Sequence, residues 1–221
     1  MSAALSFAVE LAAVALAPPR CAACDEPVGL LKAFCAPCAS TVAPAPSQGA
    51  QGRAAFSYDG AVARAIVRLK YERRPDLARP LGDLLWRALE PGRDALHGSV
   101  VVPVPLHASR LATRGFNQSM LLAQRVARGL RAPLWPLALR RLRDTPHQAA
   151  LDRQARVTNV ASAFAVRRAQ RIRGRRVLLI DDVRTTGATL EACELILRAA
   201  GALDVRWAVV AQAQADAYPA R

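Results

Sequence analysis

The chain has 221 residues, of which 52% are hydrophobic and 5% aromatic, and a formal net charge of +14 at pH 7. So many hydrophobic residues exclude a wholly disordered chain, and the length suits one α/β domain with a small appendage. The charge is concentrated, since residues 140–176 carry eleven arginines and two acidic residues. A basic centre indicates a polyanionic ligand, either a polyphosphate or a nucleic acid, although a solvated face in an arginine-rich protein has the same composition.

The first eighteen residues are apolar but are interrupted by Glu10, and no basic residue precedes them. A secretory signal has a positive start and an unbroken hydrophobic stretch, and a membrane span is longer, so we expect neither. The apolar side chains instead follow a helical spacing, which predicts a short helix with one buried side. We therefore expect a cytoplasmic protein. Export stays a minor alternative, because the small residues before Pro18 imitate a cleavage site.

Four cysteines form two Cys-x2-Cys pairs, Cys21 with Cys24 and Cys35 with Cys38, with ten residues between the pairs. Each pair places two thiolates on one tight turn, and two such turns complete a tetrahedron around zinc. Four sulfur ligands leave no open position, so this zinc is expected to be structural and to supply folding energy that so short a segment lacks. Two disulfides are the alternative, which a reducing cytoplasm disfavours.

The composition divides the chain into three parts. Residues 1–40 hold the N-terminal helix and the four-cysteine zinc module, and residues 41–52 have the small, polar, proline-containing composition of a linker. Residues 53–221 form the main domain, which begins with a predicted edge strand over residues 53–58. This order predicts a metal-stabilised head joined to a larger α/β domain.

Two amphipathic helices come next in the main domain. The first carries Val62, Ile66 and Leu69 at helical spacing, and the second carries a stripe of leucines within residues 77–89. Both stripes are typical of core packing rather than of a partner-binding surface. Lys70, which follows the first stripe, is a candidate to reach the ligand site.

A second buried strand, residues 100–107, ends at Pro103 and Pro105, which force an extended exit from the strand. Arg110 and Arg114 follow, and a further helix begins soon after them. If the strands are parallel, these arginines lie at the carboxyl edge of the sheet, where open α/β sheets bind ligands. A guanidinium pairs two oxygens of a pyrophosphate at once, so both arginines are candidate pyrophosphate ligands.

Residues 140–159 are basic and polar and lie between two predicted strands. A solvent-exposed helix and loop is one interpretation, and a phosphate- or DNA-contacting segment is the other. In the second interpretation the candidate contacts are Arg143, Thr145, Gln148, Arg153, Arg156 and Asn159.

Residues 177–190 are the most informative part of the chain. Four apolar residues predict a short buried strand, an acid pair stands at its end, and a loop of small and hydroxylated residues leads into an amphipathic helix that places Cys193 in the core. The loop offers backbone amides and hydroxyls to a phosphate, and the carboxylates suit the hydroxyls of a sugar or a divalent cation. The candidate residues for such a phosphorylated ribose are Asp181, Asp182, Thr185, Thr186, Gly187, Ala188 and Thr189.

A hydrophobic strand that ends in aspartate is also typical of nucleotide hydrolases. Those proteins need a glycine-rich loop that ends in Gly-Lys-Ser/Thr. The chain has two lysines, Lys32 and Lys70, and neither follows a glycine, which excludes this class. An ordinary strand and turn is the remaining structural alternative.

Residues 177–189 resemble the phosphoribosyl pyrophosphate (PRPP) signature of type I phosphoribosyltransferases. The resemblance implies that Asp181 and Asp182 contact the ribose hydroxyls and that residues 185–189 hold the 5′-phosphate. It also implies that residues 105–114, from Pro105 on, bind the pyrophosphate, and that the 140–159 segment is a mobile lid that excludes water. Most related signatures have an aromatic or aliphatic residue where this chain has Arg184, which places a cation beside the phosphate loop.

Further motifs extend the resemblance over residues 21 to about 212. They are the paired Cys-x2-Cys knuckles, Leu-Lys-Tyr, Val-Pro-Val-Pro-Leu-His, Arg-Gly-Phe-Asn-Gln-Ser, Arg-x-x-Asn-x-x-x-Ala-Phe and Asp-Asp-Val-x-Thr-Thr-Gly-Ala-Thr. In this order they resemble the ComF family, phosphoribosyltransferase-like proteins associated with natural competence and DNA uptake. The resemblance implies an α/β fold with a parallel sheet flanked by helices, a zinc-knuckle head, and a role in handling incoming single-stranded DNA. A competence helicase or recombination proteins are the partners that this role implies.

Two functions remain open at this point. In one, the protein binds PRPP with Mg²⁺ and acts in DNA uptake, which the basic middle of the chain favours and the few aromatic residues weaken. In the other, it is an active transferase, in which an acceptor attacks ribose C1 and Mg²⁺ with Arg110 or Arg114 stabilises the leaving pyrophosphate. The acid pair and phosphate loop favour the transferase, but no residue is recognisable as an acceptor-specific base.

Overall fold

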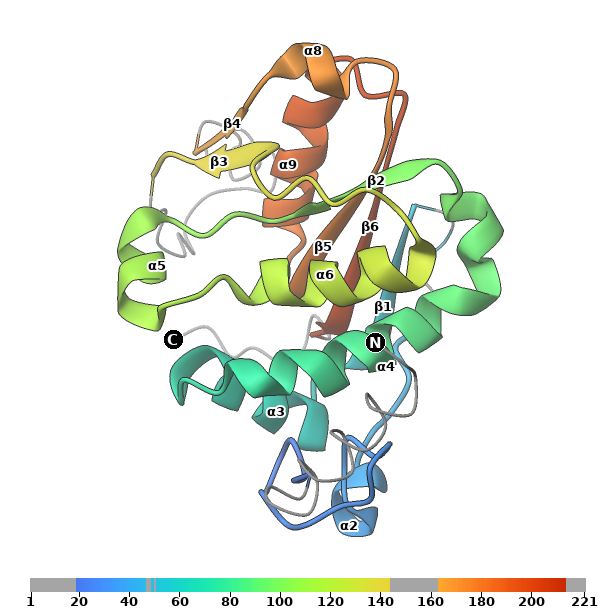
Figure 1. Cartoon of the computed structure of the whole chain (residues 1–221), viewed down its shortest axis with the longest axis vertical. Helices are drawn as coiled ribbons and strands as arrows, with labels where there is room; N and C mark the ends of the chain where they lie inside the picture. The colour runs from blue at the N-terminus through green and yellow to red at the C-terminus, as the bar shows by residue number, and fades with distance from the viewer. Residues whose placement is uncertain (1–18, 47–48, 50, 144–162, 214–221) are drawn as a thin grey trace, which may run out of the picture.

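The computed structural model describes residues 19–46, 49, 51–143 and 163–213. A four-stranded sheet with the strand order β1-β6-β5-β2 lies at its centre, and every neighbouring pair in it is parallel. Figure 1 shows helices on both sides of this sheet. The strands are β1 (Gly52–Ser57), β2 (Ser99–Pro103), β5 (Arg176–Arg184) and β6 (Asp204–Gln212). Because the strands are parallel, all their carboxyl ends meet at one edge of the sheet.

The sheet separates two apolar cores. Along β5, Leu178 and Ile180 pack into the first core, whereas Val177 and Leu179 pack into the second. The same alternation divides the valines of β2. Burial on both faces is the reason that these strands are continuous apolar runs in the sequence rather than alternating ones. The predicted parallel sheet with flanking helices is confirmed.

Three helices cover the first core, and the apolar stripes of the first two were predicted from the sequence. Val62, Ile66 and Leu69 are fully buried, and the Asp59 carboxylate caps their helix by accepting a hydrogen bond from the Gly60 amide at 2.7 Å. Such a cap satisfies an amide that would otherwise lack a partner. The helices are α3 (Gly60–Tyr71), α4 (Ala78–Leu89) and α6 (Gln118–Leu130), and the 3-10 turn η1 (Pro75–Leu77) joins the first two.

The second core lies under smaller elements. Cys193 is fully buried there with Leu190 and Leu197, which confirms its predicted position in the core. The elements on this side are α9 (Ala188–Ala199), the antiparallel pair β3 (Leu139–Arg141) and β4 (Phe164–Val166), and the short helix α8 (Ala169–Ile172).

The segment predicted as a pyrophosphate loop is largely helical. Helix α5 (Ala108–Arg114) occupies most of it, so only residues 105–107 lie outside the helix. His107 caps α5 by accepting from the Ser109 amide at 3.3 Å, and Gly115 ends the helix with a φ of 84°. This positive φ suits glycine, which has no Cβ to clash. The chain also contains η2 (Glu90–Leu96) and α2 (Ala36–Ala39).

Part of the segment predicted as a linker lies along strand β1. The Ala45 amide donates to the Ala55 carbonyl at 3.2 Å, and the Ser57 amide donates to the Ala43 carbonyl at 2.9 Å. A β-bridge pairs Pro44 with Phe56 between them. These contacts cover the outer edge of β1, which would otherwise expose unpaired backbone groups.

The predicted N-terminal helix lies in residues 1–18, outside the described residues. Among the helices that the structure describes, none is both long and apolar enough to cross a bilayer. The longest of them, α6, has 13 residues, whereas a span needs about 20.

Candidate functional site

The acid pair lies inside strand β5 rather than after it. The prediction that the strand ends at Ile180 is wrong, because the ladder with β6 continues as far as the pair Arg184–Gln212. The strand therefore holds Asp181 and Asp182, whose exposed fractions are 9% and 3%. Two adjacent carboxylates in such a setting need compensation, since burying a charge without a partner is costly.

The first turn of α6 supplies hydrogen bonds to both carboxylates. Ser119 donates from Oγ to Asp181 Oδ1 at 2.6 Å, and Gln118 donates from Nε2 to Asp182 Oδ1 at 3.3 Å. The Asp182 amide also donates to Asp181 Oδ1, at 2.9 Å. Among the described residues, Asp181 Oδ2 takes part in none of the side-chain hydrogen bonds, so this oxygen remains available to a ligand.

Asn117 fixes the position of that turn. Its side-chain oxygen accepts from the Ser119 amide at 3.0 Å as the cap of α6, and its Nδ2 donates to the Val104 carbonyl at 3.1 Å. The cap therefore ties α6 to the residues that follow β2. Gln118 and Ser119 belong to the Arg-Gly-Phe-Asn-Gln-Ser motif but were not among the predicted site residues. Their position at the start of a helix, close to a strand end, was the signal that could have assigned one.

Lys70 reaches the site from the last turn of α3. Its Nζ forms an ion pair with Asp182 Oδ2, and the side-chain exposed fractions are 20% for Lys70 and 4% for Asp182. From the sequence, Lys70 was only a candidate to reach the ligand site; in the structure it contacts the acid pair. Breaking a buried ion pair of this kind is expensive, because it leaves one charge without a partner.

The two carboxyls have opposite pKa shifts. Burial, followed by the charge of Asp182, raises the pKa of Asp181 to about 7, although the Ser119 hydroxyl acts in the other direction. Burial also disfavours the charged form of Asp182, but the Lys70 charge and hydrogen bonds outweigh it and hold the pKa of Asp182 below its ordinary value. Burial alone would lower the pKa of Lys70, but the negative charge of Asp182 outweighs burial, so the pKa of Lys70 is raised. At neutral pH the site contains one firmly ionised acid and one that exchanges its proton.

The loop after β5 leads directly into α9. Gly187 precedes the helix with a φ of 88°, and a Cβ at this position would lie 2.9 Å from the Arg184 guanidinium. The positive backbone angle favours glycine here, whereas the flexible Arg184 side chain could move to make room for a Cβ. The Thr186 hydroxyl accepts from the Ala188 amide at 3.4 Å. The first amides of a helix have no partners inside the helix, so this loop has the geometry that binds phosphate groups.

Arg184 lies against the protein beside this loop. Its guanidinium is 5.1 Å from the ring centroid of Trp207, and its Nη2 is 3.8 Å from Glu191 Oε1. The cation that distinguishes this loop from related signatures is thus partly neutralised by a residue of α9. It fills the space next to Gly187 and stacks on an aromatic ring, two roles that a local sequence pattern does not reveal.

Arg114 joins the same network, whereas Arg110 is exposed on α5. Arg114 Nη1 donates to Gln118 Oε1, and its guanidinium lies 5.5 Å from the ring centroid of Tyr71. Because Gln118 also contacts Asp182, Arg114 is connected to the acid pair through one side chain. Parallel pairing of β2 with β5 places both arginines near the carboxyl edge of the sheet, as predicted.

The four paired cysteines come together in the head. Their sulfur atoms all lie within 4.8 Å of one another, and Cys24 Sγ is 3.6 Å from Cys35 Sγ. A zinc ion bound by four thiolates at about 2.3 Å holds its sulfurs about 3.8 Å apart, so this donor set fits tetrahedral zinc. All five cysteines of the chain are free thiols in the structure, so the alternative of two disulfides is not what it contains.

The surroundings of Cys21 favour its thiolate. Burial acts to raise its pKa, but backbone amides, that of Cys35 first, outweigh burial and lower the pKa of Cys21 to about 6. Arg64 also donates from Nη2 to Cys38 Sγ at 3.8 Å. Backbone amides and a nearby cation stabilise negative charge on sulfur, which metal coordination requires.

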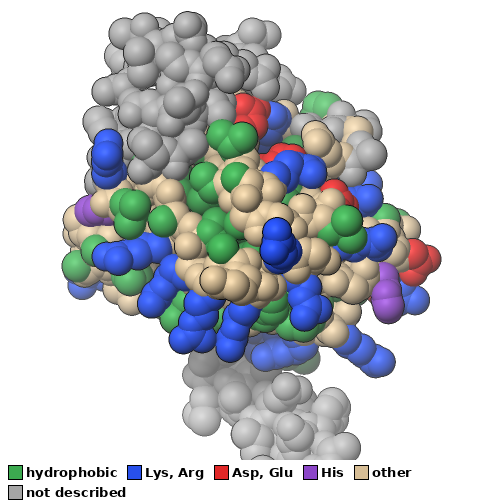
Figure 2. All heavy atoms as spheres, turned by 90° about the horizontal axis from the view of Figure 1, so that it is seen from above, with side chains coloured by type: hydrophobic (Ala, Val, Ile, Leu, Met, Phe, Trp, Pro, Cys, Tyr) green, Lys and Arg blue, Asp and Glu red, His purple; other side chains and the backbone are tan. Residues whose placement is uncertain are grey.

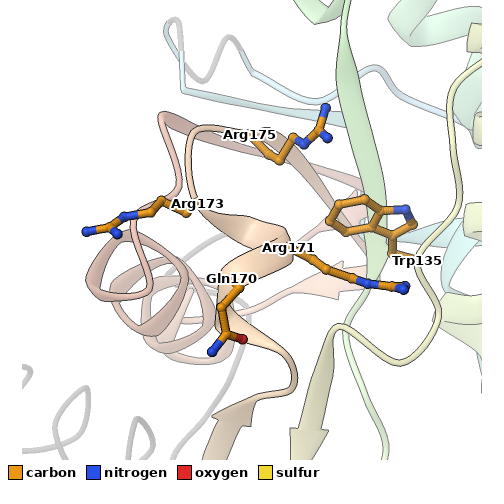
Figure 3. Close-up of a pocket in the computed structure, with 5 residues that line it drawn as sticks. All are labelled: Trp135, Gln170, Arg171, Arg173 and Arg175. Atoms are coloured by element: carbon orange, nitrogen blue, oxygen red, sulfur yellow. The ribbon is translucent and has the colours of Figure 1, made fainter.

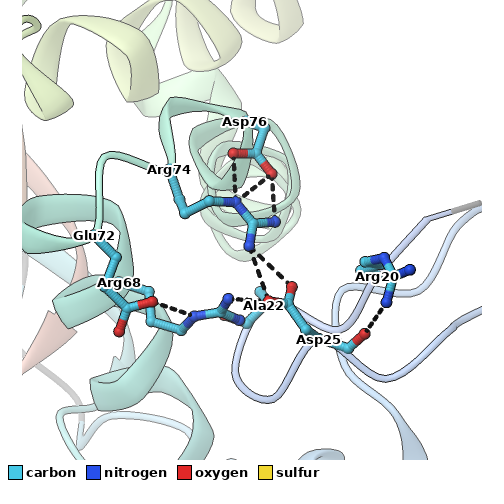
Figure 4. A network of polar contacts seen from close by, with 7 residues as sticks. All are labelled: Arg20, Ala22, Asp25, Arg68, Glu72, Arg74 and Asp76. Atoms are coloured by element: carbon cyan, nitrogen blue, oxygen red, sulfur yellow. Dashed lines mark hydrogen bonds and ion pairs between the residues drawn. The ribbon is translucent and has the colours of Figure 1, made fainter. Parts of the chain in front are cut away.

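The head is attached to α3 by an ion-pair network (Figure 4). Asp25 of the first knuckle forms an ion pair with Arg68 and accepts from Arg74 Nη1 at 2.9 Å. Arg68 also donates to Glu72 Oε2 at 2.9 Å, and Arg74 donates from Nη2 to Asp76 at 2.8 Å. These two arginines flank Lys70 in the sequence, so the head holds both ends of the segment that supplies the cation to the acid pair.

The candidate lid residues are described only in part. Arg143 is exposed just beyond β3. Arg153 and Arg156 lie outside the described residues, as do Thr145, Gln148 and Asn159.

Comparison with known proteins gives a match to one family model. Residues 117–221 match the model of the Phosphoribosyl transferase domain. This match begins at Asn117, the cap of α6, and includes β5, the acid pair and α9. It therefore covers the acid pair, the first turn of α6 and the loop before α9, but neither Lys70 nor Arg114.

Three curated proteins illustrate the similarity. Competence protein F of Haemophilus influenzae is 33% identical over 64% of this chain and 63% of its own length. DNA utilization protein YhgH of Escherichia coli K12 is 35% identical over 64% of this chain and 63% of its own length. Competence protein ComFC of Streptococcus pneumoniae is 30% identical over 72% of this chain and 66% of its own length.

The chain is thus similar to curated competence and DNA utilization proteins and carries a match to a phosphoribosyltransferase domain. The aligned part spans less than two thirds of these curated relatives. The predicted fold class is confirmed, since the structure is a parallel sheet flanked by helices. The four-cysteine head is able to hold a metal ion.

Proposed function

We propose that this protein, which resembles the ComF family, binds PRPP with Mg²⁺ at the carboxyl edge of β5 and acts in DNA uptake by handling incoming single-stranded DNA. One observation carries the proposal: the acid pair Asp181–Asp182 is held by Lys70 and by the first turn of α6, directly before a glycine-containing loop that opens α9. Names of relatives that refer to competence and DNA utilization support the biological role. The site is proposed to lie in the cytoplasm, which the four neighbouring free thiols favour.

Each part of the site suits one part of the ligand. Asp181 Oδ2 is free to accept a hydrogen bond from a ribose hydroxyl, and residues 185–189 offer amides and hydroxyls to the 5′-phosphate. Pro105, Arg110 and Arg114 lie on the side of β2, where the pyrophosphate is proposed to bind. The carboxylate oxygens of Asp181 and Asp182 are the ligands that this chain offers to Mg²⁺, which neutralises phosphate charge when bound.

Lys70 is proposed to keep the site ready for its ligand. In the described structure it holds Asp182 ionised, while Ser119 orients Asp181. A fixed carboxylate pair avoids the cost of reorganising charge when the ligand arrives. Arg114, linked to the pair through Gln118, is placed to respond to the pyrophosphate.

A second candidate is an active phosphoribosyltransferase that acts on a small acceptor. The observation that favours it is the pKa of Asp181 of about 7, because a group that exchanges its proton near neutral pH is typical of catalytic sites. In this reaction the acceptor forms a bond to ribose C1 while the bond from C1 to the pyrophosphate oxygen breaks, and the acceptor's proton is released.

Calorimetric titration of the zinc-loaded protein with PRPP and Mg²⁺ tests the proposal. We expect saturable one-to-one binding that the Asp181→Asn/Asp182→Asn protein loses. Asp204→Asn is the matched control, because Asp204 lies at the opposite end of the sheet and pairs with Arg206 and Arg198. Absence of binding by the wild-type protein, or equal binding by the acid-pair variant, would reject the PRPP site. Release of pyrophosphate on adding an acceptor would favour the transferase.

A further inference from the structure

A hollow opens at the other end of β5, far along the strand from the acid pair. It has a volume of about 340 Å³ and is lined by Trp135, Gln170, Arg171, Arg173 and Arg175 (Figure 3). A second hollow of about 310 Å³ shares Trp135 and Arg171 and adds Arg167 and Arg168 to its lining. Trp135 therefore stands between two adjoining hollows that arginines surround.

We call this region the Trp135 surface. It consists of Trp135, Arg167, Arg168, Arg171, Arg173 and Arg175. The five arginines are exposed, and none of them forms an ion pair among the described residues. Arg125, by contrast, is paired with Asp83. The stretches 132–143 and 163–176, which build the surface, contain no acidic residue. Within the described part of the chain, no ion pair compensates the charge of these five arginines.

The space-filling view shows the same imbalance. Figure 2 presents the face around α8, where Lys and Arg side chains gather along the surface with few acidic groups between them. In Figure 1, α8 lies at the end of the sheet opposite to α3, which supplies Lys70 to the acid pair. The Trp135 surface is thus separate from the proposed PRPP site.

Backbone pairing holds Trp135 in place at the sheet edge. Its amide donates to the Val101 carbonyl at 2.9 Å, and the Val101 amide donates to the Pro133 carbonyl at 2.8 Å. This short segment extends the sheet beyond β2 and leaves the indole half-buried. Arg175 lies 6.0 Å from the ring centroid, and Figure 3 shows Arg171 and Arg175 extending toward the ring from α8 and the loop before β5. The ring is thus fixed by its backbone and flanked by cations.

From this arrangement we infer that the Trp135 surface is a binding site for single-stranded nucleic acid, an inference that rests on the proposed role in DNA handling and gives it a location. Guanidinium groups pair with phosphate oxygens along a strand, and an accessible indole stacks on an unpaired base. A duplex keeps its bases stacked inside, so it uses the arginines but not Trp135. The combination of an aromatic ring with uncompensated cations therefore favours a single strand.

Affinity for a labelled oligonucleotide of about ten nucleotides tests the inference, measured by fluorescence anisotropy at several salt concentrations. Arg171→Gln/Arg175→Gln is expected to weaken binding at least about tenfold and to reduce the slope of log affinity against log salt by about 1.4, the value for two lost phosphate contacts. Arg79→Gln/Arg87→Gln removes the same charge from exposed positions of α4 and is expected to leave the slope nearly unchanged. Equal slopes for both doubles would overturn the site.

Substitutions of Trp135 distinguish base stacking from electrostatic attraction. Trp135→Leu is expected to weaken oligonucleotide binding about tenfold, whereas Trp135→Phe retains most of it and an abasic strand of equal charge is insensitive to either change. Circular dichroism and thermal unfolding verify that each variant is folded. If Trp135→Leu binds the base-containing strand as tightly as wild type, the inference is wrong.

Two kinds of failure are distinguishable. If the wild-type protein binds no oligonucleotide even at low salt, both the inferred site and the proposed DNA-handling role are rejected, while PRPP binding is judged by its own titration. If the wild type binds but all Trp135-surface variants bind equally well, the inferred site alone is rejected and DNA handling uses another surface.

Discussion

At the carboxyl end of β5, Asp181 and Asp182 are almost buried, and Lys70, Gln118 and Ser119 contact them. At the amino end of the same strand, five exposed arginines line two hollows that share Trp135, and none of them forms an ion pair among the described residues. One end therefore neutralises its charges internally, and the other leaves them open to solvent. The same strand presents two different kinds of electrostatic site.

This difference indicates two kinds of ligand. A compensated, hydrogen-bonded acid pair has fixed geometry and suits one small molecule with a defined pattern of hydroxyls and phosphates. An open group of cations exerts a long-range field and tolerates variation in the ligand, which suits a flexible polyanion. The net charge of +14 belongs to the molecule as a whole, and at the amino end of β5 a group of five arginines has no ion pair within the described residues.

Removal of zinc is expected to have the largest effect, and to affect the carboxyl end of β5 but not the amino end. Because structural zinc contributes roughly 10–16 kcal/mol in small domains, chelation is expected to lower the midpoint of thermal unfolding by at least about 10 °C. Through Asp25, Arg68 and Arg74 the loss should also disturb Lys70 and weaken PRPP binding. Oligonucleotide binding at the opposite end should persist. The chelator should have no further effect on a Cys21→Ser protein, and an equal effect there would contradict the zinc assignment.

Replacement of Lys70 should destabilise the carboxyl end specifically. Lys70→Met leaves Asp182 buried without a counter-charge, so we expect the free energy of unfolding to fall by about 3 kcal/mol. Urea unfolding measures this change. Adding Asp182→Asn should restore part of the loss, because it removes the uncompensated charge. Additive effects of the two substitutions would mean that the ion pair does not couple them.

Stability should depend on pH through Asp181. Its pKa is about 7 in the folded protein and near 3.8 when unfolded, so the folded state binds the extra proton between these values. The stability that this proton provides is complete below pH 4 and is lost as the pH rises through 7. Asp181→Asn should therefore stabilise the protein relative to wild type at pH 8, by about 2 kcal/mol, and have little effect at pH 4.

Asp182→Asn provides the opposite control for this prediction. The pKa of Asp182 is lowered in the folded protein, so its contribution to stability is present above the unfolded pKa and disappears as the pH falls through the folded one. Urea unfolding from pH 4 to 8 compares the two variants. Parallel pH profiles would contradict the opposite environments assigned to the two acids.

The smallest effect on stability is expected at the amino end of β5. Arg171→Gln/Arg175→Gln removes exposed, unpaired cations, so the free energy of unfolding should change by less than about 0.5 kcal/mol. Thermal unfolding at low and high salt checks this. A larger loss would show that these arginines hold the fold, and would weaken their assignment to a ligand.

Local sequence patterns predicted most of the elements but few of the contacts between them. The apolar runs of β2 and β5, the stripes of α3 and the cysteine spacing each reflect a short-range rule. The continuation of β5 through the acid pair depends on its partner β6, and the contacts of Gln118 and Ser119 depend on how α6 crosses the sheet. Such contacts join residues far apart in the chain, so no local pattern contains them.

Two further features could not be predicted from the sequence, for the same reason. Arg184 was recognised as unusual, but its stacking on Trp207 depends on the neighbouring strand β6. The small number of aromatic residues argued against binding of single-stranded DNA, yet Trp135 needs no second aromatic ring because β2 places it beside α8. Arginines adjacent in the folded protein, rather than other aromatic rings, complete that surface.

Competition between the two ligands tests the separation of the two ends most directly. A labelled oligonucleotide is bound to the zinc-loaded protein, and PRPP with Mg²⁺ is added to saturation at constant ionic strength. We expect the oligonucleotide to stay bound, because Asp181 and Trp135 lie at opposite ends of β5 and each ligand uses one end. Stoichiometric displacement of the oligonucleotide by PRPP would show that both ligands share one site, and would contradict the account.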